Sequence, residues 1–372
     1  MPWIHFYVGY KGDVNACCVS SIKLGNINKN GINEIWQSDS INLIREQFLQ
    51  GKYDKRCSVC INREQSGAKS LRQETFEKFS NIDINNTKFP IYFDIRFSNV
   101  CNFKCRTCWH GASSKWFDDA KQLKTTTSHQ AIIKNINDFN HFINVNGHLL
   151  LNAKEIYFAG GEPLVTEEHY LLLNYLIKHK ATNIKLRYNT NFSVLKFKSY
   201  DVLKYWKRFQ TVEVLASIDE TNELGEYIRK GLDWEVFIKN RNAIRGLTNV
   251  VFKIAPTISV FNVKTLPNFY LKCLQLNLIN PPDFYINILD RPFHYNCKIL
   301  SQKSKQIINK IYTDFYEWCQ QNNIPTSIVN QFKEVQMFMN KDDLHSKYYQ
   351  KFVKETQKLD KIRGEGYIAY KI

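Results

Sequence analysis

The chain has 372 residues and a mass of 43.9 kDa, and its 51 Lys and Arg against 35 Asp and Glu give a net charge of +16. Apolar residues make up 44% and aromatic residues 14%, which excludes an intrinsically disordered chain. No run of about 18 apolar residues is present. The start, from Met1 to His5, lacks the charged and apolar regions of a signal peptide. We therefore expect a cytoplasmic protein with no membrane partner.

The ten cysteines are the most informative part of the composition. Disulfides are rare in a reducing compartment, so this number indicates metal binding or redox chemistry. The positive charge allows a nucleic-acid surface or a set of solvated basic faces. Its densest clusters, 196–208 and 347–363, show no regular alternation with aromatic residues. This favours solvated faces and disfavours nucleic acid as a partner, although the charge alone leaves that partner open.

The first region, residues 1–80, holds four cysteines in two pairs: Cys17, Cys18, Cys57 and Cys60. Between the pairs, apolar residues at helical spacing predict a helix that begins near Asp39 and ends at Gly51. We expect this region to be a small separate module.

Strands alternate with helices in the second region, residues 90–295. Strands are predicted at 91–97, 155–158, 184–188, 212–218, 252–259 and 284–289. Their spacing fits βα units, which need roughly 30 residues each. One intervening helix is predicted at 167–178. We expect an α/β fold whose parallel sheet curves into a partial (β/α)6 TIM-like barrel, with its chemistry at the carboxyl ends of the strands. Residues 300–372 are predicted to form a helical, basic C-terminal extension.

Three cysteines, Cys101, Cys105 and Cys108, follow the first strand of this region with the spacing C-x3-C-x2-C. Iron–sulfur clusters are normally held by four thiolates, so three in one loop leave an iron open to another molecule. Lys104 and Arg106 lie between them and would offset thiolate charge. Structural zinc favours four closed ligands in paired C-x2-C units, and no suitable fourth ligand follows nearby.

This loop resembles the signature of radical S-adenosylmethionine (SAM) enzymes, and the resemblance covers about residues 90–290. After the second strand, Gly160, Gly161, Glu162 and Pro163 resemble the GGEP motif, which binds the methionine ammonium of SAM. The chemistry fits, because glycines let backbone carbonyls approach a cation and a carboxylate adds a charge-assisted hydrogen bond.

Four more positions resemble SAM contacts of this family. Asn191 follows the third strand, in a turn where Phe192 replaces a glycine. Ser217 and Asp219 follow the fourth strand, where the family contacts ribose and carboxylate, and Ile258 follows the fifth, near the expected adenine. For Asn191, Ser217 and Asp219 the alternative is a helix N-cap at a βα turn. The sequence identifies no catalytic acid, base or hydrogen donor.

The N-terminal cysteines and their surroundings resemble the opening of SPASM or twitch domains, which hold auxiliary [4Fe–4S] clusters. Such modules usually follow the barrel, and the later cysteines of a full SPASM set are missing here, so a single-cluster twitch-like module is the better match. The expected ligands are Cys17, Cys57 and Cys60. The fourth is Cys18, Cys297, a substrate atom or nothing. A four-thiolate zinc site and a site with no metal remain alternatives.

The resemblance implies that a [4Fe–4S] cluster cleaves SAM reductively to a 5′-deoxyadenosyl radical, which removes hydrogen from a substrate. It also implies a one-electron donor such as flavodoxin or ferredoxin. The substrate class indicated is a peptide or protein, with a sugar or nucleoside as the alternative. A hypothesis from another class is a zinc-stabilised, basic nucleic-acid-binding protein without catalysis, which predicts affinity that falls steeply with salt.

Overall fold

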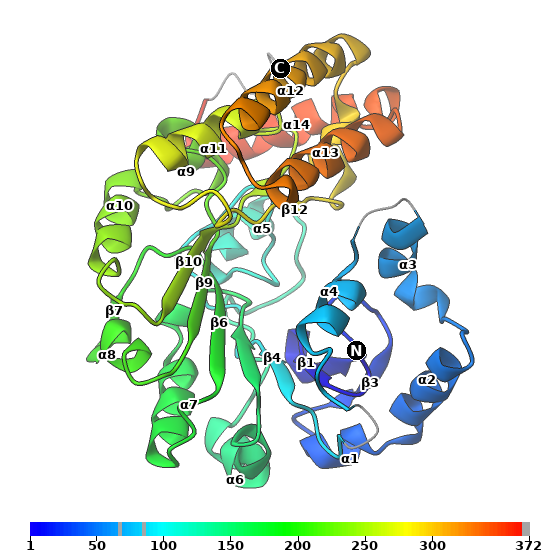
Figure 1. The fold of residues 1–372 in the computed structure, drawn as a ribbon, viewed down its shortest axis with the longest axis vertical. Helices are drawn as coiled ribbons and strands as arrows, with labels where there is room; N and C mark the ends of the chain where they lie inside the picture. Colours follow the sequence, from blue (N-terminus) through cyan, green and yellow to red (C-terminus); the bar gives the residue numbers. More distant parts are fainter. Residues whose placement is uncertain (66–68, 84–86, 367–372) are drawn as a thin grey trace. The chain divides into compact units, whose positions relative to one another are not determined.

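A computed structural model describes residues 1–65, 69–83 and 87–366 of the chain (Figure 1). These residues form two compact units. The first contains residues 1–101, 132–189 and 196–213, and the second contains 102–131, 190–195 and the chain from 214 onward. The division therefore passes through the cysteine loop, between Cys101 and Asn102, and through strand β9 (Val212–Ala216).

The first unit is built on a sheet with the strand order β6-β5-β4-β1-β2-β3. The strands are β1 (His5–Val8), β2 (Asp13–Asn15), β3 (Lys23–Asn26), β4 (Tyr92–Ile95), β5 (Glu155–Phe158) and β6 (Lys185–Thr190). Neighbouring strands from β1 through β4 and β5 to β6 are parallel, whereas β2 and β3 are added antiparallel. The parallel register aligns the carboxyl ends of β4 and β5, where the cysteine loop and the Gly160–Pro163 turn begin.

The helices of the first unit are α1 (Ile32–Trp36), α2 (Asp39–Leu49), α3 (Ser58–Gln65), α4 (Leu71–Lys78), α6 (Phe139–Leu150), α7 (Glu167–Lys178) and α8 (Val202–Trp206), and β7 (Lys196–Phe197) pairs with β8 (Tyr200–Asp201). Two glutamates in the first turn of α7 complement its macrodipole. His169 of α7 packs edge-on against Phe158 and Tyr188, which places α7 on the apolar face of the sheet.

The second unit contains α5 (Phe117–Gln122), α9 (Asn222–Ile228), α10 (Trp234–Ala243), β10 (Val250–Ile254), β11 (Thr257–Ile258), α11 (Leu266–Gln275), β12 (Asn287–Ile288), α12 (Gln302–Gln321), α13 (Thr326–Lys341) and α14 (His345–Arg363). Strand β10 is the neighbour of β9, and β11 pairs with β12 in parallel. Figure 1 shows α12, α13 and α14 as the long helices near the end of the chain. α14 ends at Gly364, whose φ of 62° is left-handed.

The expected α/β fold with a parallel sheet and a helical C-terminal region is confirmed. The helices predicted at Asp39 and at 167–178 are α2 and α7. The sixth predicted strand, 284–289, is reduced to a parallel bridge at Phe284 and to the two residues of β12. Strand β1 was not predicted, and it joins the N-terminal region directly to β4. Residues 367–372 of the expected C-terminal extension lie outside the described residues.

None of the helices in the described part of the chain combines the length and the apolar character that a membrane crossing requires.

Candidate functional site

The turn at Gly160–Pro163 lies against the backbone that leads into Cys101. The amide of Glu162 donates to the carbonyl of Val100 at 2.7 Å. Gly161 has a φ of 53°, and a Cβ there would lie 2.2 Å from the same carbonyl oxygen. The approach is close enough that only glycine fits this position. The structure thus brings two sequence-predicted elements together, the glycine turn and the start of the cysteine loop.

Glu162 is only 1% exposed, and its orientation is fixed locally. Its Oε1 accepts from the amide of Leu164 at 3.0 Å, and Thr166 Oγ1 donates to its carbonyl oxygen at 2.9 Å. Pro163 begins the short 3-10 helix that supplies this amide. The carboxylate is therefore held in place by the turn that carries it, as a preorganised cation ligand would be.

Cys105 and Cys108 belong to the second unit. Burial raises the pKa of both thiols, that of Cys108 to about 12. The charge of the nearby Arg229 guanidinium lowers the pKa of Cys105, and so does the hydrogen bond that its Nη1 donates to Sγ at 3.8 Å. Metal or cluster binding at these cysteines must therefore displace protons, as it does at any thiol ligand whose pKa lies above neutral.

Asn191 and its neighbours form a compact turn in the second unit. Asn191 Nδ2 donates to Asn102 Oδ1 at 2.8 Å, which ties the turn to the cysteine loop. Phe192, where the sequence resemblance leads us to expect a glycine, keeps a left-handed φ of 56°. Its side chain is fully buried and packs against Phe237 and Phe252. Burial of the ring offsets the roughly 1–2 kcal/mol that this conformation costs an L-residue.

Asp219 is buried and holds two donors on one oxygen. Its Oδ1 accepts from Arg229 Nη2 at 2.8 Å and from the amide of Thr257 at 2.7 Å. Its Oδ2 has no hydrogen-bond partner among the described residues. The N-cap of α9 is Thr221, so neither Asp219 nor Ser217 caps that helix.

The other two predicted SAM contacts differ in exposure. Ser217 is half-buried, and its amide donates to Thr190 O at 2.8 Å. Ile258 is fully buried in β11, paired with Ile288.

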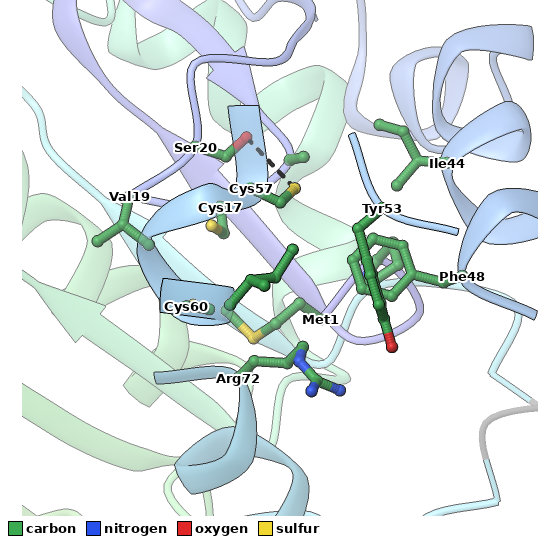
Figure 2. Close-up of a pocket in the computed structure, with 13 residues that line it drawn as sticks. Met1, Cys17, Val19, Ser20, Ile44, Phe48, Tyr53, Cys57, Cys60 and Arg72 are labelled. Atoms are coloured by element: carbon green, nitrogen blue, oxygen red, sulfur yellow. Dashed lines mark hydrogen bonds between the residues drawn. The ribbon is translucent and has the colours of Figure 1, made fainter. Parts of the chain in front are cut away.

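Cys17, Cys57 and Cys60 line one pocket of the first unit, with about 500 Å³ of space that includes its open mouth. In Figure 2 Ser20 lies beside Cys57, and its hydroxyl is 4.0 Å from Cys57 Sγ. Most other lining residues are apolar, among them Ile44 and Phe48. Burial raises the pKa of Cys17 to about 11 and also raises that of Cys57. The pocket thus gathers three of the four N-terminal cysteines.

Among the described residues, no group of three His, Cys, Asp or Glu side chains has the arrangement of a single-ion site. A four-iron cluster is larger than one ion and holds its thiolates farther apart. Cys17, Cys57 and Cys60 share one pocket wall.

Cys18 is not among the residues that line this pocket. Burial raises the pKa of its thiol, and the next largest influence is the charge of Asp94, followed by those of Cys17 and Arg96. Cys297, the other expected fourth ligand, is fully buried in the second unit.

The sheet of the first unit has a polar face that was not predicted from the sequence. The strand register places four side chains in one row: Tyr7, Asp94, Tyr157 and Arg187. A second row, His5, Tyr92, Glu155 and Lys185, lies alongside it. Paired residues of a parallel sheet share a face, so this polar face is opposite to the one that packs on α7.

Asp94 is the most buried member of the polar face. It is 0% exposed, and burial raises its pKa although Arg96, at 3.4 Å, opposes the shift. Its Oδ2 has no hydrogen-bond partner among the described residues. The Arg96 guanidinium also lies over the Tyr7 ring, 5.0 Å from its centroid. A buried acceptor beside a guanidinium and two tyrosines suits a ligand that both donates and accepts hydrogen bonds.

The alternation of polar and apolar residues in β4, β5 and β6 was the available signal for this face. Parallel strands covered on both faces usually read as continuous apolar runs. These strands instead carry a charged or tyrosine residue at every second position, as in Tyr92-Phe93-Asp94-Ile95.

The chain is similar to the crystal structure of Streptococcus suis SuiB bound to S-adenosylmethionine, with 15% identity and a TM-score of 0.37 over 77% of this chain and 59% of that one. It is also similar to native anSMEcpe with bound AdoMet, with 18% identity and a TM-score of 0.44 over 63% of each chain. A third similar structure is S. suis SuiB bound to the precursor peptide SuiA, with 14% identity and a TM-score of 0.41 over 79% of this chain and 63% of that one.

The chain thus spans about three fifths of the length of these structures. No curated protein matches the chain. Residues 1–61, which include both N-terminal cysteine pairs, match the SPASM family, described as an iron-sulfur cluster-binding domain. This match confirms the expected SPASM/twitch-like resemblance of the N-terminal region.

Proposed function

We propose that this protein is a radical SAM enzyme that uses one [4Fe–4S] cluster to cleave SAM and carries a second, auxiliary cluster in its N-terminal module. One observation carries the proposal: the C-x3-C-x2-C loop follows β4, and Val100, the residue before its first cysteine, accepts a hydrogen bond from Glu162 in the turn that follows β5. Motifs that recur separately by chance are here adjacent at the carboxyl ends of neighbouring parallel strands, where such folds place their chemistry.

Cys101, Cys105 and Cys108 are the proposed ligands of the first cluster, which when bound and reduced supplies one electron to SAM. The chain's own residues bind and orient the cosubstrate. The Gly160–Pro163 turn offers carbonyl oxygens and the fixed Glu162 carboxylate to the methionine ammonium. Asp219 offers its Oδ2, which has no hydrogen-bond partner among the described residues, to a hydroxyl of the ribose.

The auxiliary cluster is assigned to Cys17, Cys57 and Cys60. The pocket that these three share supports this ligand set, and the SPASM match supports the kind of group bound. Cys18 lies outside the pocket wall, so we propose that a non-cysteine group completes the fourth position.

The proposed substrate is a peptide or protein segment that reaches the polar face of the first unit. An amide group presents one donor and one acceptor, and Asp94 Oδ2 together with the Arg96 guanidinium offers the complementary pair. The one-electron donor is a flavodoxin- or ferredoxin-type protein, because the proposed reaction consumes single electrons.

Cysteine variants test this function. Protein reconstituted with iron and sulfide under anaerobic conditions is assayed for iron content and for 5′-deoxyadenosine formed from SAM. We expect Cys101→Ala to abolish SAM cleavage and to lower the iron content. Cys57→Ala should lower the iron content but leave measurable SAM cleavage, because Cys57 is a proposed ligand of the auxiliary cluster. Cys273→Ala, at a buried cysteine outside both sites, is the control and should change neither quantity. Equal loss of cleavage in Cys101→Ala and Cys57→Ala would refute the assignment of two separate clusters.

A further inference from the structure

Arg229 faces Cys105 because the backbone holds the two segments together. The amides of Lys104 and Arg106, on either side of Cys105, donate to carbonyls of segment 228–230 at 2.9 and 2.8 Å. Residue 229 is therefore opposite residue 105, as in a short antiparallel ladder. The position of the guanidinium beside the sulfur follows from this backbone pairing as well as from the side-chain conformation.

The side chain of Arg229 is fixed at both ends of its guanidinium. Nη1 donates to Cys105 Sγ at 3.8 Å, and Nη2 donates to Asp219 Oδ1 at 2.8 Å. Asp219 is itself anchored by the amide of Thr257. Arg229 is 9% exposed, so solvent and salt screen its charge little. A planar fork held in this way presents a directed N–H group to the sulfur.

We propose that Arg229 is a positioning residue that hydrogen-bonds the Cys105 thiolate and raises the reduction potential of the cluster bound there. This inference rests on the proposed function. Reduction transfers one electron from an external donor to the cluster, which gains one negative charge, and the donor is oxidised by one electron. No proton moves. A buried cation and an N–H···S bond stabilise the more negative state, and hydrogen bonds and net charge near the sulfurs are known determinants of cluster potential.

Asp219 limits this effect and also makes it possible. Its carboxylate lies beside the guanidinium and cancels part of its charge, but it also prevents Arg229 from turning away from Cys105. Asp219, which the sequence predicts as a SAM contact, thus uses Oδ1 for Arg229, and its Oδ2 has no hydrogen-bond partner in the part of the chain that the structure describes.

The test is a redox titration of the whole reconstituted chain, in which electron paramagnetic resonance measures the fraction of reduced cluster at each potential. The cluster in question is identified as the component whose spectrum changes when SAM is added. For Arg229→Gln we expect at least a tenfold fall in the ratio of reduced to oxidised cluster at a fixed potential, which corresponds to a shift of about 59 mV for one electron. Arg229→Lys keeps the charge but cannot bridge Cys105 and Asp219, so a smaller shift in the same direction is expected.

Lys230→Gln is the matched control. It removes one positive charge from the neighbouring residue, whose side chain is 43% exposed and paired with Glu365. We expect no shift from this change. A potential in Arg229→Gln equal to that of the unchanged protein would overturn the inference. If Arg229→Gln does not assemble a cluster, Arg229→Lys decides, and an unshifted value there overturns the inference as well. If no component responds to SAM in the unchanged protein, the proposed function itself fails.

Discussion

Gly161 carries the closest backbone approach in the candidate site. Its left-handed φ and the 2.2 Å separation that a Cβ would have from Val100 O exclude any larger residue without movement of the loop that leads into Cys101. The neighbouring amide of Glu162 donates to the same carbonyl. The geometry of the glycine turn and the position of the first cysteine are therefore linked through a single peptide group.

Gly161→Ala should destabilise the protein and disturb this link. We expect the free energy of unfolding to fall by about 2 kcal/mol or more, because a backbone clash adds to the cost of a left-handed alanine. Denaturant unfolding of the apoprotein measures the change. The control is Gly246→Ala, where a Cβ meets nothing within 4 Å. Equal midpoints for the two variants would contradict the contact with Val100.

Residue-scale features were the least accessible to prediction. The cysteine loop and the glycine turn could be identified because their residues are consecutive and their spacing is specific. Arg229 could not, because it is separated by 124 positions from the sulfur that it contacts. The buried oxygen of Asp94 likewise depends on the pairing of β4 with strands from distant parts of the chain.

Among the secondary-structure elements, the C-terminal helix α14 stabilises the loop between Cys105 and Cys108. Arg106 is fully buried and pairs with Asp360 at the end of α14 and with Glu365 just beyond it. Its guanidinium stacks 3.5 Å from the centroid of the Tyr227 ring. A helix more than 250 positions away in the sequence thus helps to fix the conformation of the loop.

Arg106→Leu should therefore be strongly destabilising. The carboxylates of Asp360 and Glu365 would lose the buried guanidinium with which they pair. Such a loss typically lowers the free energy of unfolding by about 3–5 kcal/mol. Chemical denaturation of the apoprotein at neutral pH is the measurement. Lys358→Leu, which removes an exposed partner of Glu355 on the same helix, should cost about 1 kcal/mol or less. The expectation fails if the two variants unfold at the same denaturant concentration.

His169 on helix α7 makes the stability of the folded protein depend on pH. Burial lowers the pKa of this histidine to about 3, and its Nε2 lies 2.9 Å from the Tyr188 hydroxyl. Between pH 6.5 and pH 3 the unfolded chain binds a proton that the folded chain does not, so stability falls as the pH falls.

His169→Gln removes this titration. Below pH 6 the unchanged apoprotein should lose up to about 1.4 kcal/mol of stability per pH unit more than the variant does. The comparison is made by denaturant unfolding at pH 6, 5 and 4. The exposed His148→Gln on α6 serves as control and should keep the slope of the unchanged protein. Parallel curves for His169→Gln and the unchanged protein would rule out this explanation.

At the scale of secondary-structure elements, the periodicity of apolar residues predicted the helices whose positions are determined by the local sequence. The apolar stripe of α7 gave its bounds, and α2 begins where its apolar spacing indicated. Strand β1 was missed because it is short and its role depends on pairing with β4, more than 80 positions away. The sixth strand was over-predicted because Phe284 is buried and its apolar neighbours are half-buried without forming an extended ladder.

At the scale of the whole molecule, the ten cysteines say more about function than the net charge of +16 does. Seven cysteines fall in the two proposed cluster sites or beside them, whereas Cys273, Cys297 and Cys319 are buried in the second unit. The basic residues lie partly in ion pairs and partly on exposed faces, so the net charge by itself identifies no binding partner. The cysteines therefore carry the functional argument, and the charge only restricts the substrates that would be attracted.

The most direct test of the central claim is whether the chain cleaves SAM. Protein reconstituted anaerobically should be brown, contain about eight iron atoms per chain, four for each [4Fe–4S] cluster, and release 5′-deoxyadenosine and methionine in equal amounts when SAM and a strong one-electron reductant are added. A colourless, zinc-loaded protein that forms no 5′-deoxyadenosine under these conditions would contradict the account.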